Sequence, residues 1–282
     1  MASPTIAEVI SEFEAWANPA WQETWDNCGW QVEPGVAHQP AYMLVCLTPT
    51  LAVMQEALAW RQRGVGVNLI FAHHPLIFTP LTAVTQADAV GTVLQLAMVH
   101  QIAIYSAHTN FDQVHQGTAD ILAQVLSLQG VEPVVPTQPG IGYGRVGNLP
   151  TPLTSQDLLA QIYSCLSPFQ LHHSPLPEAP NQIERVAVLG GSGASFIAAV
   201  ARTGAQAYLT SDCKFHQFQE ARDRQIFLID AGHYATERPA CQALVSFFQR
   251  QGSAWVSLSQ RDEDFRCYYS APPSKSSQPQ QL

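Results

Sequence analysis

The sequence predicts an α/β fold with largely parallel sheets. Short apolar runs alternate with amphipathic segments along most of the 282 residues, a pattern typical of parallel strands that are joined by helices. The alternation has a similar rhythm in both halves of the chain, which indicates an internal duplication. Between the halves, from about 129 to 181, prolines become frequent and the rhythm is interrupted.

Each expected element follows from local signals. Ser3 before Pro4 is typical of an N-cap followed by proline at the first helical position, so we expect the first helix over 3–16. Apolar runs predict the strands, and amphipathic stretches predict the helices. The expected strands cover 42–47, 67–71, 102–106, 145–149, 185–189, 207–210, 226–230 and 254–258, and the remaining helices cover 51–62, 87–100, 117–128, 155–165, 194–202, 215–222 and 237–251.

This pattern divides the chain into four parts. We expect a first α/β lobe over 1–130 and a second α/β lobe over 183–268. The proline-rich stretch 131–182 is expected to connect them, with one strand and one helix inside it. The last residues, 269–282, are polar and rich in proline, so we expect a disordered tail.

The composition argues against several classes of protein. Only 12% of the residues are charged and 46% are hydrophobic, so we expect subunit contacts to cover much of the surface. The net charge of −9 argues against a nucleic acid or an anionic membrane as the main partner. We expect a cytoplasmic protein, because the N-terminus has no secretory signal, no segment is long enough to span a bilayer, and six cysteines occur without a C-x-x-C pair.

Two adjacent histidines are the most informative local feature. The segment FAHHPLIF at 71–78 places His73 and His74 at the end of a buried strand, which Pro75 terminates. Strand ends are the usual location of sites in α/β sheets. Successive side chains of a regular strand point to opposite faces. At an irregular strand end, the two imidazoles either converge on one ligand or each bind a separate metal ion.

Two later strand ends repeat this chemistry. His108 and His233 each follow a predicted strand, and Asp112 and Glu237 each lie four residues further on. Imidazole and carboxylate ligands together suit zinc, manganese or iron. Thr236 is expected to cap the last helix, which would place Glu237 at its N-terminus. Four histidines and two carboxylates form a suitable ligand set for two ions, although each residue alone also fits a structural or capping role.

Several motifs resemble those of the Nif-three-like family of dinuclear-metal hexameric proteins, which are often labelled homologues of a type-two GTP cyclohydrolase. The motifs are WDNCGWQV at 25–32, HHPLIF at 73–78, SAHTNFD at 106–112, GGSG at 190–193, TSDCKFH at 210–216 and DAGHYATE at 230–237. They follow the order of the family over nearly the whole chain. Cys28, Trp30 and Ser211 depart from the residues usual at their positions, and none of these departures removes an expected metal ligand.

The resemblance implies a site, a fold and an assembly. The implied ligands of two divalent ions are His73, His74, His108, Asp112, His233 and Glu237. The implied fold has two intertwined α/β lobes with mixed, mostly parallel sheets, and the short stretch 131–182 leaves no room for the extra domain of some family members. The implied assembly is a toroidal homo-hexamer whose metal sites face an internal cavity.

Two other features have open interpretations. The turn LGGSGA at 189–194 could hold a phosphate on its N–H groups, but it lacks the lysine of a P-loop, so a tight turn with positive φ is favoured. Lys214 and His216 follow another strand. They either act catalytically, by binding a substrate anion or moving a proton, or they only begin a surface helix.

These observations favour a metal-dependent hydrolase with a nucleotide-like or phosphorylated small molecule as its substrate. Two ions would activate water for attack on carbon or phosphorus and stabilise the negative charge that develops. The family label makes the purine ring of GTP one candidate, but a phosphoester or an amide suits such a site equally well. The alternative is a non-enzymatic hexameric protein that stores or delivers metal or acts as an adaptor.

Overall fold

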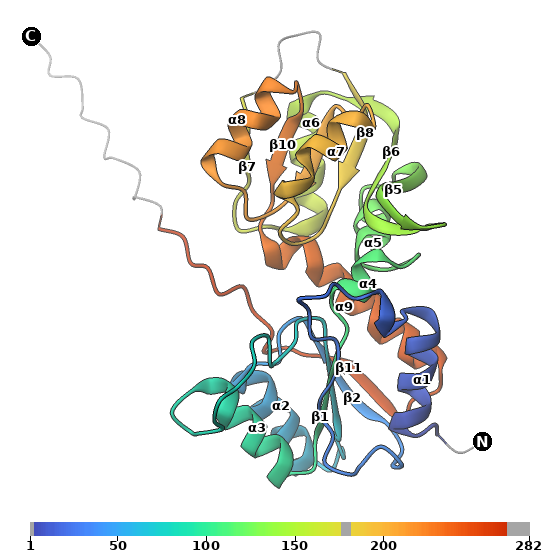
Figure 1. Ribbon diagram of the computed structural model, residues 1–282, viewed down its shortest axis with the longest axis vertical. Helices are drawn as coiled ribbons and strands as arrows, with labels where there is room; N and C mark the ends of the chain where they lie inside the picture. Colours follow the sequence, from blue (N-terminus) through green and yellow to red (C-terminus); the bar gives the residue numbers. More distant parts are fainter. Residues whose placement is uncertain (1–2, 176–181, 270–282) are drawn as a thin grey trace, which may run out of the picture.

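Two lobes, each built on one β-sheet, make up the protein (Figure 1). The computed structural model describes residues 3–175 and 182–269. The strand order is β1-β4-β3-β2-β11 in the first sheet and β5-β6-β8-β9-β10-β7 in the second. The predicted α/β class with two sheets of mostly parallel strands is confirmed. The expected disordered tail lies, from residue 270 onward, outside the described residues.

The first lobe is built from both ends of the chain. Its elements are α1 (Ile6–Trp16), the short 3-10 helix η1 (Pro19–Trp21), β1 (Gly29–Val32), β2 (Tyr42–Cys46), α2 (Leu51–Gln62), β3 (Leu69–Ala72), α3 (Ala89–Val99), β4 (Ala103–Ser106), α9 (His233–Arg250) and β11 (Trp255–Leu258). Strands β4, β3, β2 and β11 are parallel, and β1 is antiparallel to β4.

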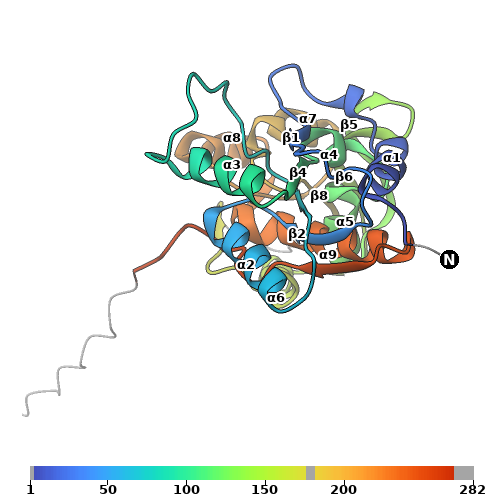
Figure 2. The same cartoon turned by 90° about the horizontal axis from the view of Figure 1, so that it is seen from below.

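Alternation along the central strands determines which helices cover each face of the first sheet. Val45 and Phe71 belong to a core cluster with residues of α1 and α9, whereas Leu44 and Ile70 pack with residues of α2 and α3. Neighbouring residues of a strand point to opposite faces. The apolar runs that predicted these strands therefore reflect burial on both faces (Figures 1 and 2).

The second lobe is inserted between β4 and α9. Its elements are α4 (Thr109–Gln113), α5 (Thr118–Val125), β5 (Gln129–Gln138), β6 (Ile141–Leu153), α6 (Ser155–Leu166), β7 (His172–His173), β8 (Ile183–Val188), the 3-10 helix η2 (Ala194–Phe196), α7 (Ile197–Arg202), β9 (Ala207–Thr210), α8 (Phe215–Asp223) and β10 (Phe227–Asp230). Strands β8, β9 and β10 are parallel. Residues of α5 and α6 cover one face and residues of α7 and α8 the other.

Two segments belong to a different lobe from the part of the chain to which the sequence assigned them. The described part of 131–182 contributes β6, α6, β7 and most of β5 to the second lobe, so it is more than a connector. Its prolines are compatible with a sheet because Pro133 and Pro136 lie in the edge strand β5. The last strand, β11, pairs with β2 of the first sheet. The lobes are therefore intertwined.

The first helix begins later than its sequence signal indicates. Thr5, and not Ser3, is the N-cap of α1, because its side chain accepts a hydrogen bond from the backbone N–H of Glu8. The Glu8 carboxylate in turn accepts from the backbone N–H of Thr5. This reciprocal capping box satisfies two backbone donors and explains why the structure prefers Thr5.

No described helix is long and apolar enough to cross a membrane.

A buried guanidinium connects strand β6 of the second lobe to helices α4 and α5 of the same lobe. Arg145 on β6 is 2% exposed, and its Nε donates to Oδ1 of Asp120 on α5 over 2.6 Å. The other donors of this side chain reach the backbone carbonyls of Gln113, Val114, Gly142 and Gly144. A buried charge of this kind is tolerated only when it is paired and hydrogen-bonded.

We predict that Asp120→Ala destabilises the protein strongly, because it leaves the Arg145 charge buried without its counter-ion. The free energy of unfolding should fall by about 3–5 kcal/mol, as measured by urea denaturation. The matched control is Glu132→Ala, which removes the exposed partner of Arg185 and should cost less than about 1 kcal/mol. Equal losses in the two variants would contradict this account of Arg145.

Candidate metal centre

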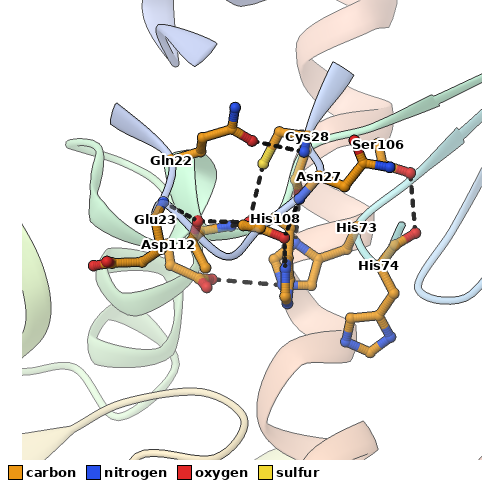
Figure 3. A network of polar contacts seen from close by, with 12 residues as sticks. Gln22, Glu23, Asn27, Cys28, His73, His74, Ser106, His108 and Asp112 are labelled. Carbon is orange, nitrogen blue, oxygen red and sulfur yellow. Dashed lines mark hydrogen bonds and ion pairs between the residues drawn. The ribbon is translucent and has the colours of Figure 1, made fainter. Parts of the chain in front are cut away.

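Six side chains that the sequence indicates as metal ligands lie together between the lobes. His73 and His74 follow β3, His108 and Asp112 lie at and within α4, and His233 and Glu237 lie in the first turns of α9. Figure 3 shows Asp112 approaching this cluster from α4 on one side and His74 from the end of β3 on the other. The structure thus brings together groups that are more than 160 residues apart in the sequence.

Each histidine of the cluster is fixed by a hydrogen bond at Nδ1. The Nδ1 partners are the Ala107 carbonyl for His73 (2.7 Å), Thr48 Oγ1 for His74 (2.8 Å), Asp26 Oδ1 for His108 (2.8 Å) and Asp212 Oδ2 for His233 (2.7 Å). Partners of this kind orient metal-binding imidazoles and fix their tautomer. With Nδ1 occupied in all four rings, Nε2 is the atom left to bind a metal ion.

Three of the Nε2 atoms lie near two carboxylates, of which Glu237 is buried and Asp112 half-buried. Oε2 of Glu237 lies 3.0 Å from His74 Nε2 and 2.9 Å from His233 Nε2. His73 Nε2 lies 3.5 Å from Asp112 Oδ1 and 3.8 Å from Glu237 Oε1. Glu237 therefore contacts histidines that follow β3 as well as a histidine of its own helix, α9.

The carboxylates of the cluster favour positive charge on the neighbouring imidazoles. Burial lowers the pKa of His73, but the Asp112 and Glu237 carboxylates outweigh this and raise it to about 9. Burial is likewise outweighed at His233, whose pKa rises to about 10 because Glu237 and Asp212 are close. The pKa of His74 falls, chiefly because of burial. Divalent cations would balance the negative charge of the same carboxylates without protonation of the rings.

The donor set fits divalent metal ions. His73 Nε2 and Asp112 Oδ1 are both buried and have no hydrogen-bond partner among the described residues, which is costly unless another group binds them. Potential ligand atoms lie within 4.8 Å of one another in two triads, His73 with His74 and His108, and His74 with His233 and Glu237. A set of imidazole nitrogens and carboxylate oxygens suits zinc, manganese or iron.

The last helix begins earlier than expected and so places both of its ligands. Helix α9 starts at His233, after Gly232 with φ +84°, so Thr236 is not its N-cap as predicted. The Thr236 hydroxyl lies inside the first turn, where it donates to the Gly232 carbonyl and accepts from the backbone N–H of Gly191. His233 and Glu237 are then one helical turn apart on one face, which directs both side chains at the cluster.

The glycine turn at 189–194 lies directly against Glu237. The N–H of Gly191 donates to Thr236 Oγ1, and the N–H of Gly193 donates to Thr210 Oγ1, so both amides are occupied within the protein. Gly191 has φ +66°, and a Cβ added there would lie 2.1 Å from Glu237 Oε1. The favoured interpretation, a tight turn with positive φ, is confirmed.

A cavity of about 690 Å³ opens beside the cluster and is lined by residues of both lobes. Five of the six clustered side chains, all except His73, belong to its wall. A smaller cavity of about 330 Å³ adjoins His74 and His233 on another side and contains Arg266, whose Nη1 lies 3.3 Å from Asp212 Oδ1. The centre is therefore accessible to a small molecule.

Lys214 and His216 lie outside this arrangement. Both side chains are exposed at the start of α8, and neither lines either cavity beside the cluster. Lys214 is the N-cap residue of α8, and its backbone N–H donates to the Gln217 side chain. Their catalytic role stays a prediction.

Sequence reasoning assigned no role to the residues that fix the histidine rings. Asp26 and Asp212 lie within quoted motifs, whereas Thr48 follows a strand in an unremarkable sequence. Nothing in the local sequence indicates which histidine will contact a carboxylate that lies in a loop or just after a strand. Only the fold reveals these pairs.

The fold and this cluster define a protein class with a histidine and carboxylate centre between two α/β lobes. The model of the family Duf34/NIF3 (NGG1p interacting factor 3) matches residues 4–263. A "GTP cyclohydrolase 1 type 2 homolog" from Nostoc sp. is 60% identical over 94% of this chain and 98% of that protein. The "Protein NIF3 homolog" from Schizosaccharomyces pombe is 32% identical over 88% of this chain and 92% of that protein.

Solved structures agree with these sequence matches. A Bacillus cereus protein related to NIF3 superposes with a TM-score of 0.87 at 22% identity, and covers 95% of this chain and 100% of that chain. The chain belongs to the Duf34/NIF3 family, as the sequence motifs indicated.

We predict that Gly191→Ala displaces the Glu237 carboxylate and removes bound metal. The added Cβ would collide with Oε1, so metal analysis after loading with zinc should show a loss of at least one ion relative to wild type. The control is Gly204→Ala, where φ is +76° but no atom lies within 4 Å of the added Cβ.

The control variant should lose about 1–2 kcal/mol of stability from backbone strain alone and keep its metal. If both variants retain the same metal content, the contact between Gly191 and Glu237 does not control the centre.

Proposed function

We propose that the protein binds two divalent metal ions and is a metal-dependent hydrolase of a small molecule. The observation that carries this proposal is the arrangement of the four histidines: each is fixed at Nδ1, which leaves Nε2 to bind a metal ion, and three of them have Nε2 within 4 Å of the Asp112 or Glu237 carboxylate. The cavity beside them supports an enzyme over a purely structural site, because a structural metal site is usually closed.

The protein's own residues would hold and orient the ions. One triad, His73, His74 and His108, would bind the first ion, and Asp112 lies close enough to join it. His233 and Glu237 would bind the second ion, because the single free lone pair of His74 Nε2 can bind only one of the two. Bound ions would supply Lewis acidity, which activates water near neutral pH and stabilises developing negative charge.

The finer features of this function are also proposals. The substrate is a nucleotide-like or phosphorylated small molecule, as the names of the relatives suggest, and the ions are zinc, manganese or iron. A homo-hexamer is supported by the low charged fraction of the sequence and by exposed apolar side chains around Met98 and Val99. A cytoplasmic location is supported by six free cysteines.

We predict that the two triads lose their ions separately. His108→Ala should lower the zinc content of the reconstituted protein from two ions to one, and His233→Ala should do the same, since each removes a ligand of one triad. His74→Ala should likewise remove one ion, because the single free nitrogen of His74, Nε2, can bind only one ion. His100→Ala, which changes an exposed histidine outside the cluster, should keep two.

Inductively coupled plasma mass spectrometry on dialysed protein measures these contents. A His108→Ala variant with the full wild-type content would contradict the two-triad assignment.

Turnover distinguishes the enzyme from the alternative, a non-enzymatic metal-binding or adaptor protein. The protein is loaded with zinc, manganese or iron and incubated with a panel of nucleotides, phosphoesters and cyclic amides. Hydrolysis should appear with at least one metal and should fall by at least a hundredfold in His73→Ala, because loss of a metal ligand disables the centre. If no metal-loaded form hydrolyses any compound while His73→Ala differs only in metal content, the enzyme proposal is wrong.

A further inference from the structure

Exposed aromatic rings lie directly beside the metal centre. Trp25 is 56% exposed and Phe78 is 53% exposed, and both line the larger cavity. Their rings meet edge to face, with centroids 6.0 Å apart. The His108 ring lies 6.1 Å from Trp25 and 6.4 Å from Phe78. Large aromatic surfaces held in place beside a site are typical of positions that a bound ligand covers.

The inserted lobe contributes a second aromatic pair to the same cavity. Tyr143 on β6 stacks on Phe196 of η2, with centroids 5.5 Å apart and an interplanar angle of 26°. Both residues line the cavity and belong to the second lobe, whereas Trp25 and Phe78 belong to the first. Aromatic rings from both lobes therefore border the space next to the metal centre, which favours a ligand with a flat ring.

A carboxylate offers this ligand a fixed hydrogen-bond acceptor. The Tyr143 hydroxyl donates to Glu23 Oε1 over 2.8 Å, and Gln113 Nε2 donates to the Tyr143 oxygen over 3.0 Å. Glu23 lines the cavity, and no described residue donates a hydrogen bond to its Oε2. A carboxylate that is held at one oxygen and free at the other is suited to an N–H donor of a ligand.

The cavity wall lacks the side chains that usually bind phosphates. Its carboxylates are Glu23, Asp112 and Glu237, and no lysine or arginine is among the described residues that line it. A chain of phosphates would therefore find no cationic side chain in this wall and could bind only to the metal ions. An uncharged ligand needs no such partner.

We propose that the cavity recognises an uncharged, planar nitrogen heterocycle with ring N–H donors. Its faces pack against Trp25 and Phe78, its N–H groups donate to Glu23, and its reactive bond faces the metal centre. This inference rests on the proposed hydrolase function, and it narrows the substrate from nucleotide-like or phosphorylated compounds in general to the ring itself.

Binding of small probes tests the inference. The probe is isocytosine, a neutral ring with adjacent N–H donors, compared with pyrimidin-4-one, which lacks the amino group, and with inorganic phosphate. Isothermal titration calorimetry on zinc-loaded protein of verified metal content measures the affinity of each. Isocytosine should bind at least about tenfold more tightly than pyrimidin-4-one, because a hydrogen bond to a charged group is lost.

Variants identify the residues that recognise the ring. Glu23→Gln and Trp25→Ala should each weaken isocytosine binding by about tenfold, through loss of the charged acceptor and of ring packing. The control for the first is Glu14→Gln, which alters a similar Tyr105–Glu14 pair outside the cavity. The control for the second is Phe215→Ala, at an aromatic side chain that is 88% exposed on α8. Both controls should bind isocytosine as the wild type does.

The results separate this inference from the proposed function. Phosphate binding without isocytosine binding, or unchanged affinity in Glu23→Gln, would overturn the heterocycle proposal even if the protein hydrolyses another compound. Ring binding that depends on Glu23 and Trp25 supports it even if no turnover is found. If Trp25→Ala and Phe78→Ala instead change the oligomeric state without changing ring affinity, the aromatic pair is a subunit contact and the inference is wrong.

Discussion

The buried negative charge of Glu237 determines how the parts of the centre fit together. Its Oε2 lies within 3.0 Å of the imidazoles of His74 and His233, which are far apart in the sequence, and a carboxylate so deeply buried is tolerated only beside positive charge. The pKa of Glu237 falls well below its usual range, because contact with His233 outweighs the opposing effect of burial. The early start of α9 places the Glu237 carboxylate beside these imidazoles, and the absence of a Cβ at Gly191 leaves space for it.

Much of the fold was predictable because burial leaves a periodic record in the sequence. The strands at 42–46, 69–72 and 103–106 are apolar on both faces, so continuous apolar runs marked them correctly. Strand β5 was missed because its prolines suggest a connector. Prolines are tolerated in an edge strand, but the sequence does not show which strand lies at the edge of the sheet. The pairing of β11 with β2 is a contact between distant segments and has no local signal.

The clustering of the candidate side chains was predictable from the sequence, but the groups that hold them in place were not. Histidines follow three predicted strands, and at two of these strand ends a carboxylate comes four residues later. The hydrogen bond that His108 Nδ1 donates to Asp26 Oδ1 and the close approach of Gly191 to Glu237 depend on chain folding over long separations. The Thr236 prediction failed because threonine suits both a cap and the first turn of a helix, and here its hydroxyl serves the neighbouring lobe.

Because the ribosome synthesises the chain from its N-terminus, the first lobe is completed only after the second. All strands of the second sheet come from one continuous stretch that ends at Asp230, whereas the first sheet still lacks β11 and the cover of α9 at that stage. Until α9 emerges, the aromatic core around Phe13 and Phe71 lacks its partner Phe248, and the edge of β2 has no neighbour. Nascent surfaces of this kind attract chaperones and aggregate readily. The lobe that is synthesised first is thus the one completed last.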